Sequence, residues 1–190
     1  YAGMSASFLY DKVKVISVVG SDFGANMDIL TSRDIDTSGV EVVADAKTFF
    51  WSGKYHNDMN SRDTLTTDLN VLANFDPKIP ASYQDCDYLL LGNLTPEVQI
   101  AVLNRLDKKP KLVVLDTMNY WMDVALADLM AVLKRVDVLT INDAEARQLS
   151  GEYSLVKAAK KILTMGPRYL IIKKGEHGSL LFGEDQMFSA

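Results

Sequence analysis

Five short polar segments carry the side chains of this sequence that could perform chemistry, and each follows an apolar run. The segments are Gly20–Asp22, Gly92–Leu94, Asp116–Asn119, Asn142–Glu145 and Lys174–Gly178. The apolar runs before them are continuous, which is typical of strands that are covered on both faces. Ligands bind beyond the carboxyl ends of the strands in open parallel sheets. If the sheet is parallel, the five segments therefore converge on one edge.

Asn142 and Glu145 allow two interpretations. Their spacing predicts a capping box, in which the Asn side chain accepts a hydrogen bond from the third helical amide and the Glu side chain reaches back. Amide and carboxylate oxygens also suit a hydrated Mg²⁺, which would imply phosphates nearby. The segment by itself leaves both interpretations open.

The other strand ends are equally open. Asp116 could cap the residues that follow it, or it could accept hydrogen bonds from a substrate hydroxyl beside Asn119. The glycines of the segment 174–178 form either a plain turn or a turn that lets the backbone approach a nucleotide closely. His177 is expected to be an exposed turn residue rather than a catalytic base.

Strands and helices alternate along most of the chain, and this order predicts right-handed βαβ units and a parallel sheet with helices on both sides. The expected strands are 13–19, 88–91, 111–115, 136–141 and 169–173. The expected helices are about 96–107, 125–134, 143–150 and 154–165.

The stretches 48–55 and 64–71 break this order. In the second stretch apolar and polar residues alternate with a period of two, which indicates a strand with one solvated face. We therefore expect a small antiparallel sheet inserted early in the domain. It could be an edge extension of the main sheet or a flap over a site.

Composition excludes several classes of protein. The 190 residues are 48% hydrophobic with a formal net charge of −5, which fits one globular domain, or one domain with a small appendage, and argues against nucleic-acid binding. Cys86 is the only cysteine, so a reducing, cytoplasmic setting is expected. His56 and His177 are far apart in sequence, so a zinc site is not expected. No apolar run approaches the roughly 20 residues of a membrane span.

Taken in order, five motifs resemble the ribokinase-like family of sugar and nucleoside kinases, the phosphofructokinase B group. They are VVGSDFG (18–24), DIDTSGV (34–40), DTMN (116–119), NDAE with ARQLSG (142–151) and KKGEHG (173–178). The resemblance implies an α/β fold, an αβα three-layer sandwich with a mainly parallel sheet and a small antiparallel β lid. It implies one partial domain over residues 1–190, with the lid inserted at about 40–75.

The resemblance also implies a function. Such enzymes transfer the γ-phosphoryl group of ATP, with Mg²⁺, to a hydroxymethyl group of a small sugar; the alternatives are a nucleoside kinase or a catalytically silent ligand-binding protein on the same fold. The family's catalytic aspartate, in a Gly-Ala-Gly-Asp element, is expected after Ala190, and its Gly-Gly sugar-binding pair before Tyr1. A homodimer through the lid is a further expectation, and neither a nucleic acid nor a membrane is expected as a partner.

Residue by residue, the resemblance implies three groups of contacts. The metal and phosphate element is Asn142 with Glu145. The nucleotide contacts are Lys173, Lys174, Gly175, Glu176, His177 and Gly178. The substrate contacts are Asn93, Asp116, Asn119 and, in the lid, Trp51.

Overall fold

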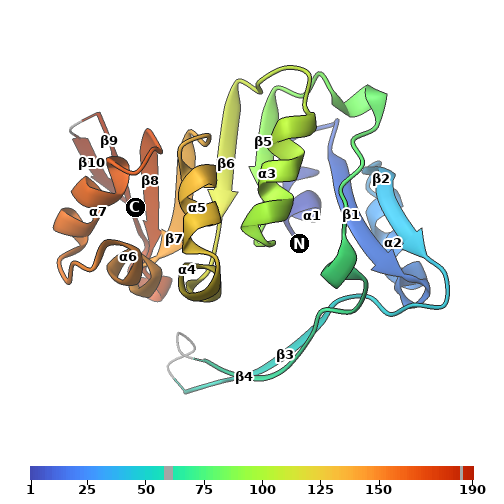
Figure 1. The fold of residues 1–190 in the computed structure, drawn as a ribbon, viewed down its shortest axis with the longest axis horizontal. Coiled ribbons are helices and arrows are strands. Elements are labelled where there is room, and N and C mark those ends of the chain that lie inside the picture. Colours follow the sequence, from blue (N-terminus) through green and yellow to red (C-terminus); the bar gives the residue numbers. More distant parts are fainter. Residues whose placement is uncertain (58–61, 185) are drawn as a thin grey trace. The chain divides into compact units, whose positions relative to one another are not determined.

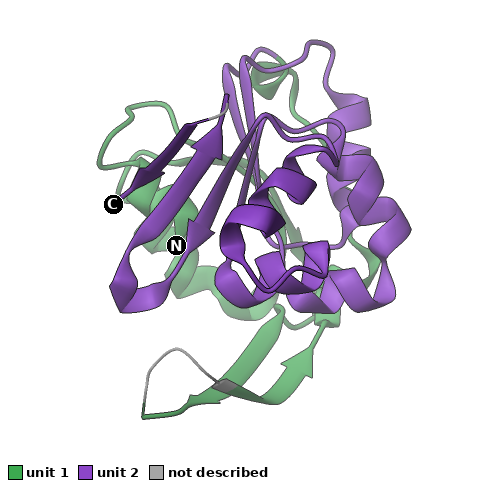
Figure 2. Ribbon diagram, turned by 90° about the vertical axis from the view of Figure 1, so that its left-hand side faces the viewer, with its two compact units in different colours: residues 1–84 green, residues 85–190 purple. Residues whose placement is uncertain are grey.

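A computed structural model of the chain describes residues 1–57, 62–184 and 186–190. The chain divides into two compact units, residues 1–84 and residues 85–190, which Figure 2 shows in different colours. No helix among the described residues is both long enough and apolar enough to cross a membrane.

The first unit contains a short parallel sheet. Strand β1 (Lys14–Gly20) pairs in parallel with β2 (Asp36–Val43), and helix α2 (Gly24–Thr31) connects them (Figure 1). Helix α1 (Ala2–Ala6) precedes β1. The buried hydrophobic side chains of this unit are Val18, Val19, Ile35 and Tyr83.

A second, antiparallel pair of strands in the same unit confirms the predicted small sheet. Strand β3 (Phe50–Tyr55) pairs with β4 (Arg62–Asp68), with Phe50 opposite Asp68. Strand β4 ends before the predicted boundary at residue 71. Leu69, with φ −64° and ψ −36°, is already in the helical conformation, and Asn70, with a φ of 47°, begins the 3₁₀ helix η2 (Asn70–Asn74). A further 3₁₀ turn, η3, spans Ala81–Tyr83.

The second unit is built on a six-stranded sheet with the order β10-β9-β8-β7-β6-β5. Strands β5 to β8 are parallel, whereas β9 and β10 are antiparallel to their neighbours. The strands are β5 (Tyr88–Leu91), β6 (Leu112–Asp116), β7 (Val138–Asn142), β8 (Tyr169–Lys173), β9 (Ser179–Gly183) and β10 (Gln186–Ser189).

Helices cover one face of this sheet in the described second unit, whereas the order of strands and helices predicted helices on both sides. The helices are α3 (Pro96–Arg105), α4 (Asn119–Val124), α5 (Leu126–Leu133), α6 (Asp143–Ser150) and α7 (Leu155–Leu163), and the 3₁₀ turn η4 is Gly175–His177. Each connection from β5 to β8 joins neighbouring parallel strands, and right-handed crossovers in one direction place every helix on the same side, as Figures 1 and 2 show. The strand residues beneath them are fully buried: Val113, Leu115, Leu139, Ile141, Leu170 and Ile172.

Candidate functional site

The carboxyl ends of three adjacent parallel strands bring predicted site residues together. Asp116 ends β6, Asn142 ends β7 and Lys173 ends β8. In the sheet register, Asp116 lies opposite Thr140, and Asn142 lies opposite Lys173. Three side chains that are far apart in sequence therefore share one edge, which we call the carboxyl edge of the second unit.

An ion pair spans this edge. The Lys173 ammonium donates a hydrogen bond to Asp116 Oδ1 at 3.0 Å, across the intervening strand β7. The Asp116 side chain is 33% exposed and the Lys173 side chain 50% exposed. The strand-end prediction placed both residues at this edge but did not pair them.

Asn142 and Glu145 form the predicted capping box. The backbone amide of Glu145 donates to Asn142 Oδ1 at 2.8 Å, and the amide of Asn142 donates to Glu145 Oε2 at 2.7 Å. Glu145 is only 5% exposed. The structural interpretation of this segment is thus confirmed, and the cap holds both side chains in one conformation.

The donor chemistry of this segment fits Mg²⁺. One side-chain oxygen of Asn142 and one of Glu145 each accept a hydrogen bond from the other residue's backbone amide, and Mg²⁺ is usually held by one or two carboxylates with several waters retained. Asp143 is engaged elsewhere, because its Oδ2 accepts a hydrogen bond from Arg147 at 2.5 Å. Among the described residues no cluster of three His, Cys, Asp or Glu side chains could hold a metal. A metal here would therefore rely on Glu145, Asn142 and water.

The predicted nucleotide segment is a compact turn that follows β8. The Lys174 amide donates to the Gly178 carbonyl at 2.8 Å, and the Gly178 amide donates to the Gly175 carbonyl at 3.2 Å. Gly175 and Gly178 have φ values of 58° and 77°, which L residues rarely adopt. The exposed His177 has its Nε2 at 3.4 Å from Glu176 Oε1 within the turn. The turn exposes the side chains of Glu176 and His177 together with its backbone.

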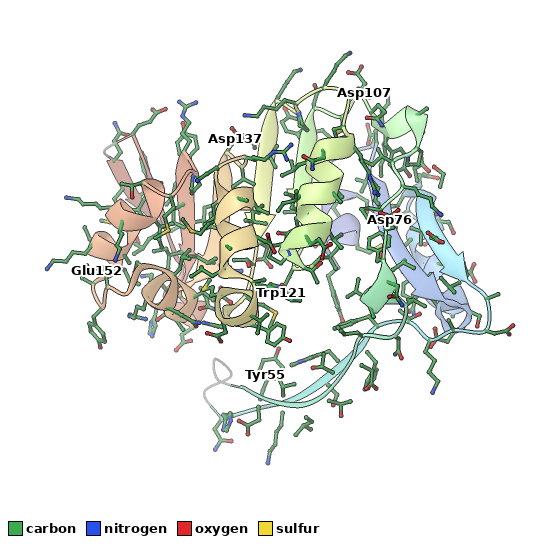
Figure 3. All side chains as sticks on the ribbon, in the orientation of Figure 1. Tyr55, Asp76, Asp107, Trp121, Asp137 and Glu152 are labelled. Carbon is green, nitrogen blue, oxygen red and sulfur yellow. The ribbon has the colours of Figure 1, made fainter. Side chains whose placement is uncertain are left out.

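A second cluster at the carboxyl edge joins Asn93 to helix α4. The indole of Trp121 donates to Asn93 Oδ1 at 2.8 Å, and the Asn93 amide lies 3.1 Å from Met118 Sδ. The ring of Tyr120 meets Trp121 edge-on, with 4.9 Å between centroids. Figure 3 labels Trp121 at the end of the sheet opposite Asp137. Trp121 was not predicted as a site residue, because no local pattern connects it to Asn93, 28 positions earlier.

Asn119 is also held by a side chain that the sequence did not single out. Its amide donates to Gln148 Oε1 on α6, and the amide of Gln148 donates to Asp123 Oδ1 at 2.8 Å. Thr117 between the predicted residues is 3% exposed, and its hydroxyl has no hydrogen-bond partner among the described residues. Asp116 and Asn119 therefore flank a buried hydroxyl at the same strand end.

Trp51, the remaining predicted contact, belongs to the first unit. Its indole donates to Thr64 Oγ1 at 3.3 Å, across the β3–β4 pair. A cavity of about 470 Å³ lies at the end of this pair where β3 begins and β4 ends. It is lined by Asp22, Phe23, Asn26, Lys47, Thr48, Phe49, Phe50, Asp68 and Asn70.

Thr48 organises the wall of this cavity. Its amide and hydroxyl donate to Asp22 Oδ1 at 2.9 and 2.6 Å, and its hydroxyl accepts from the Gly20 amide at 3.0 Å. These hydrogen bonds favour the carboxylate form and hold the pKa of Asp22 below its ordinary value of 3.8. Asn70 donates to the Thr48 carbonyl at 2.8 Å. Thr48 thus links Gly20 at the end of β1 to Asn70, just beyond the end of β4.

Comparison with known proteins identifies the family. The model of the pfkB family carbohydrate kinases matches residues 4–189. The chain belongs to this family. The resemblance read from the five motifs is therefore confirmed, and so is the expected fold, since solved ribokinase-family kinases superimpose with TM-scores of about 0.7.

Three relatives illustrate the range of the family. A cytidine kinase from Thermococcus kodakarensis is 28% identical over 182 residues, which cover 94% of this chain and 64% of that protein. A nucleoside kinase from Burkholderia thailandensis in complex with inosine has a TM-score of 0.72 at 16% identity, covering 93% of this chain and 56% of the other. An E. coli protein described as a ribokinase II, in complex with ATP and Mg²⁺, has a TM-score of 0.66 at 19% identity, covering 93% and 61%. The chain thus spans less than two thirds of the length of each of these relatives.

Proposed function

We propose that the protein is an ATP-dependent phosphotransferase that moves a phosphoryl group to a hydroxymethyl group of a small sugar. Family membership supports the reaction class. The observation that carries the proposal is the carboxyl edge of the second unit, where the Asn142–Glu145 box and the glycine turn follow two adjacent strands.

The nucleotide phosphates would lie at the start of helix α6. Amides at a helix N-terminus attract anions, but the first turn of α6 also carries the carboxylates of Asp143 and Glu145. Arg147 neutralises Asp143, so Glu145 is the carboxylate that opposes a phosphate. A Mg²⁺ bound there would offset this repulsion and neutralise charge on the transferred group. Lys173, next to Asn142 in the register, adds a positive charge.

The acceptor would be recognised by hydrogen-bonding side chains at the ends of β5 and β6. Asn93 and Asp116 supply acceptor oxygens, and Asn119 supplies an amide. Trp51 is the aromatic side chain that we assign to the lid. The general base is the aspartate predicted after Ala190, and it stays a prediction.

A nucleoside acceptor is the second candidate, because the relative from Thermococcus kodakarensis is a cytidine kinase. ADP release from Mg·ATP with a panel of pentoses, hexoses and nucleosides separates the two. Turnover that is faster with ribose or a hexose than with any nucleoside supports the first candidate, and the reverse order supports the second. Saturable ligand binding without ADP release would favour a catalytically silent binding protein instead.

We also propose that the protein works in the cytoplasm on small molecules and dimerises through the antiparallel strands. The support is the exposed apolar side chains of β3 and β4, since Phe50 is 52% and Leu65 is 65% exposed. A monomeric mass by light scattering at all concentrations tested would contradict the dimer. The variant Leu65→Lys should shift a dimer to monomers without lowering the unfolding temperature.

A further inference from the structure

The ion pair between Asp116 and Lys173 joins two residues that were assigned to different ligands. Lys173 was expected to contact the nucleotide, and Asp116 was expected to contact the acceptor substrate. In the structure each is the other's partner, at 3.0 Å across strand β7. While this pair is intact, one N–H group of Lys173 and one oxygen of Asp116 are used on each other rather than on the two ligands.

The pair is suited to exchange rather than to permanent structure. Both side chains are partly exposed, at 33% and 50%, and ion pairs of this kind are weak. Lys173 has a flexible stem and three donors, so it can redirect its ammonium without moving the backbone.

The new position of the ammonium would be close by. Lys173 lies opposite Asn142, the N-cap of α6, and neighbouring strands are roughly 4.8 Å apart. A phosphate at the start of α6 is therefore within reach of the same ammonium. A nucleotide phosphate carries more negative charge than one carboxylate and attracts the ammonium more strongly.

We propose that Asp116 is a counter-ion that holds Lys173 until nucleotide binds, and that Lys173 then exchanges Asp116 for the phosphates. This inference rests on the proposed kinase function. Asp116 acts on nucleotide binding through Lys173 and is in that respect a positioning residue. The exchange leaves the carboxylate of Asp116 open to a hydroxyl of the acceptor, so nucleotide binding prepares the acceptor contact.

A double-mutant cycle on nucleotide affinity tests the exchange. The ligand is a non-hydrolysable ATP analogue with Mg²⁺, and the dissociation constant is measured by calorimetry on the whole protein. Asp116→Asn should tighten binding about two- to fivefold, since Lys173 no longer has to leave a charged partner. Lys173→Met should weaken binding about ten- to hundredfold, because a charge-assisted contact is lost. In the Lys173→Met background, Asp116→Asn should leave the affinity unchanged.

Four results would overturn the exchange. Tighter binding by Asp116→Asn in both backgrounds would mean that the carboxylate merely repels the phosphates. Weaker binding by the single variant Asp116→Asn would mean that Asp116 orients Lys173 in the nucleotide complex. If the wild type binds the analogue and neither substitution changes the affinity, the exchange is refuted but the kinase proposal is not. If the wild type does not bind the analogue, both proposals are refuted.

A matched control is the ion pair at the other edge of the same sheet. Lys109 lies 3.6 Å from Asp137, which Figure 3 labels at the end of the sheet away from Trp121. Lys109→Met removes the same charge from the protein but should not change nucleotide affinity. Thermal unfolding of each variant checks that the fold is retained.

Discussion

Glu145 has an observed role in the cap and a proposed role in metal binding, and substitution can separate the two. Its carboxylate accepts a hydrogen bond from the Asn142 amide at 2.7 Å, and we propose that it also supports Mg²⁺. Glutamine completes a capping box as well as glutamate does. Glu145→Gln therefore keeps the cap but removes the charge, whereas Glu145→Ala removes both.

The structure sets the size of each effect. Glu145→Ala leaves the Asn142 amide without its partner at a site where Glu145 is 5% exposed, so the free energy of unfolding should fall by about 1–2 kcal/mol. Glu145→Gln should change it by less than about 0.5 kcal/mol. If the carboxylate supports Mg²⁺, both variants should need about tenfold more Mg²⁺ for half-maximal ADP release, which corresponds to about 1.4 kcal/mol.

Urea unfolding and Mg²⁺ titrations of ADP release provide the two measurements. Thr95→Ala is a matched control, since Thr95 caps α3 in the same unit by accepting from the Val98 amide at 3.3 Å. It should lose about 1 kcal/mol of stability with no change in the Mg²⁺ requirement. The metal role would be refuted if Glu145→Gln kept the wild-type Mg²⁺ requirement, or if its activity fell only as far as its stability.

Three further substitutions test the geometry of the two units. The pKa of Asp22 is lowered in the folded state, so its contribution to stability is present above the ordinary value of 3.8 and is lost as the pH falls below that value. Thr48→Val should therefore make the unfolding midpoint depend less on pH in this range. An unchanged pH dependence would contradict the role of Thr48. Gly178→Ala should lower the free energy of unfolding by about 1 kcal/mol or more and weaken nucleotide binding, because φ is 77° and the added methyl meets a backbone carbonyl. The control Gly24→Ala, at a site with open space, should change neither the stability nor the binding. Trp121→Phe should raise KM for the acceptor but not for ATP, because it removes the indole hydrogen bond that holds Asn93. Equal changes of KM for both substrates would contradict this.

Local sequence rules predicted the transition from β7 to α6. The capping box depends on side chains three positions apart, so the spacing of Asn142 and Glu145 determines its hydrogen bonds. The parallel strands were also predicted, because continuous apolar runs mark them, although only alternate residues of β6 and β8 are buried. The early end of β4 was not predicted, because no local pattern indicates the helical conformation of Leu69 or the positive φ of Asn70. The tie from Asn70 to Thr48, 22 residues earlier, is a contact that no local pattern encodes.

The contacts between strand ends show the same limit. The sequence placed Asp116 and Lys173 at one edge, but their pairing depends on the strand order, which leaves only β7 between them. Asn93 and Trp121 are likewise joined only when β5 and β6 are neighbours. Topology therefore decides which of the predicted side chains are held by other side chains.

The cap and the metal role of Glu145 support each other physically. A buried carboxylate is costly unless hydrogen bonds or a cation stabilise its charge, and the Asn142 amide supplies one such bond. The cap also fixes the conformation of the Glu145 side chain, so no further ordering is needed when a hydrated cation arrives. A capped glutamate is thus a better support for Mg²⁺ than a mobile surface glutamate would be. For this reason the confirmed capping box strengthens, rather than replaces, the chemical interpretation of the same residues.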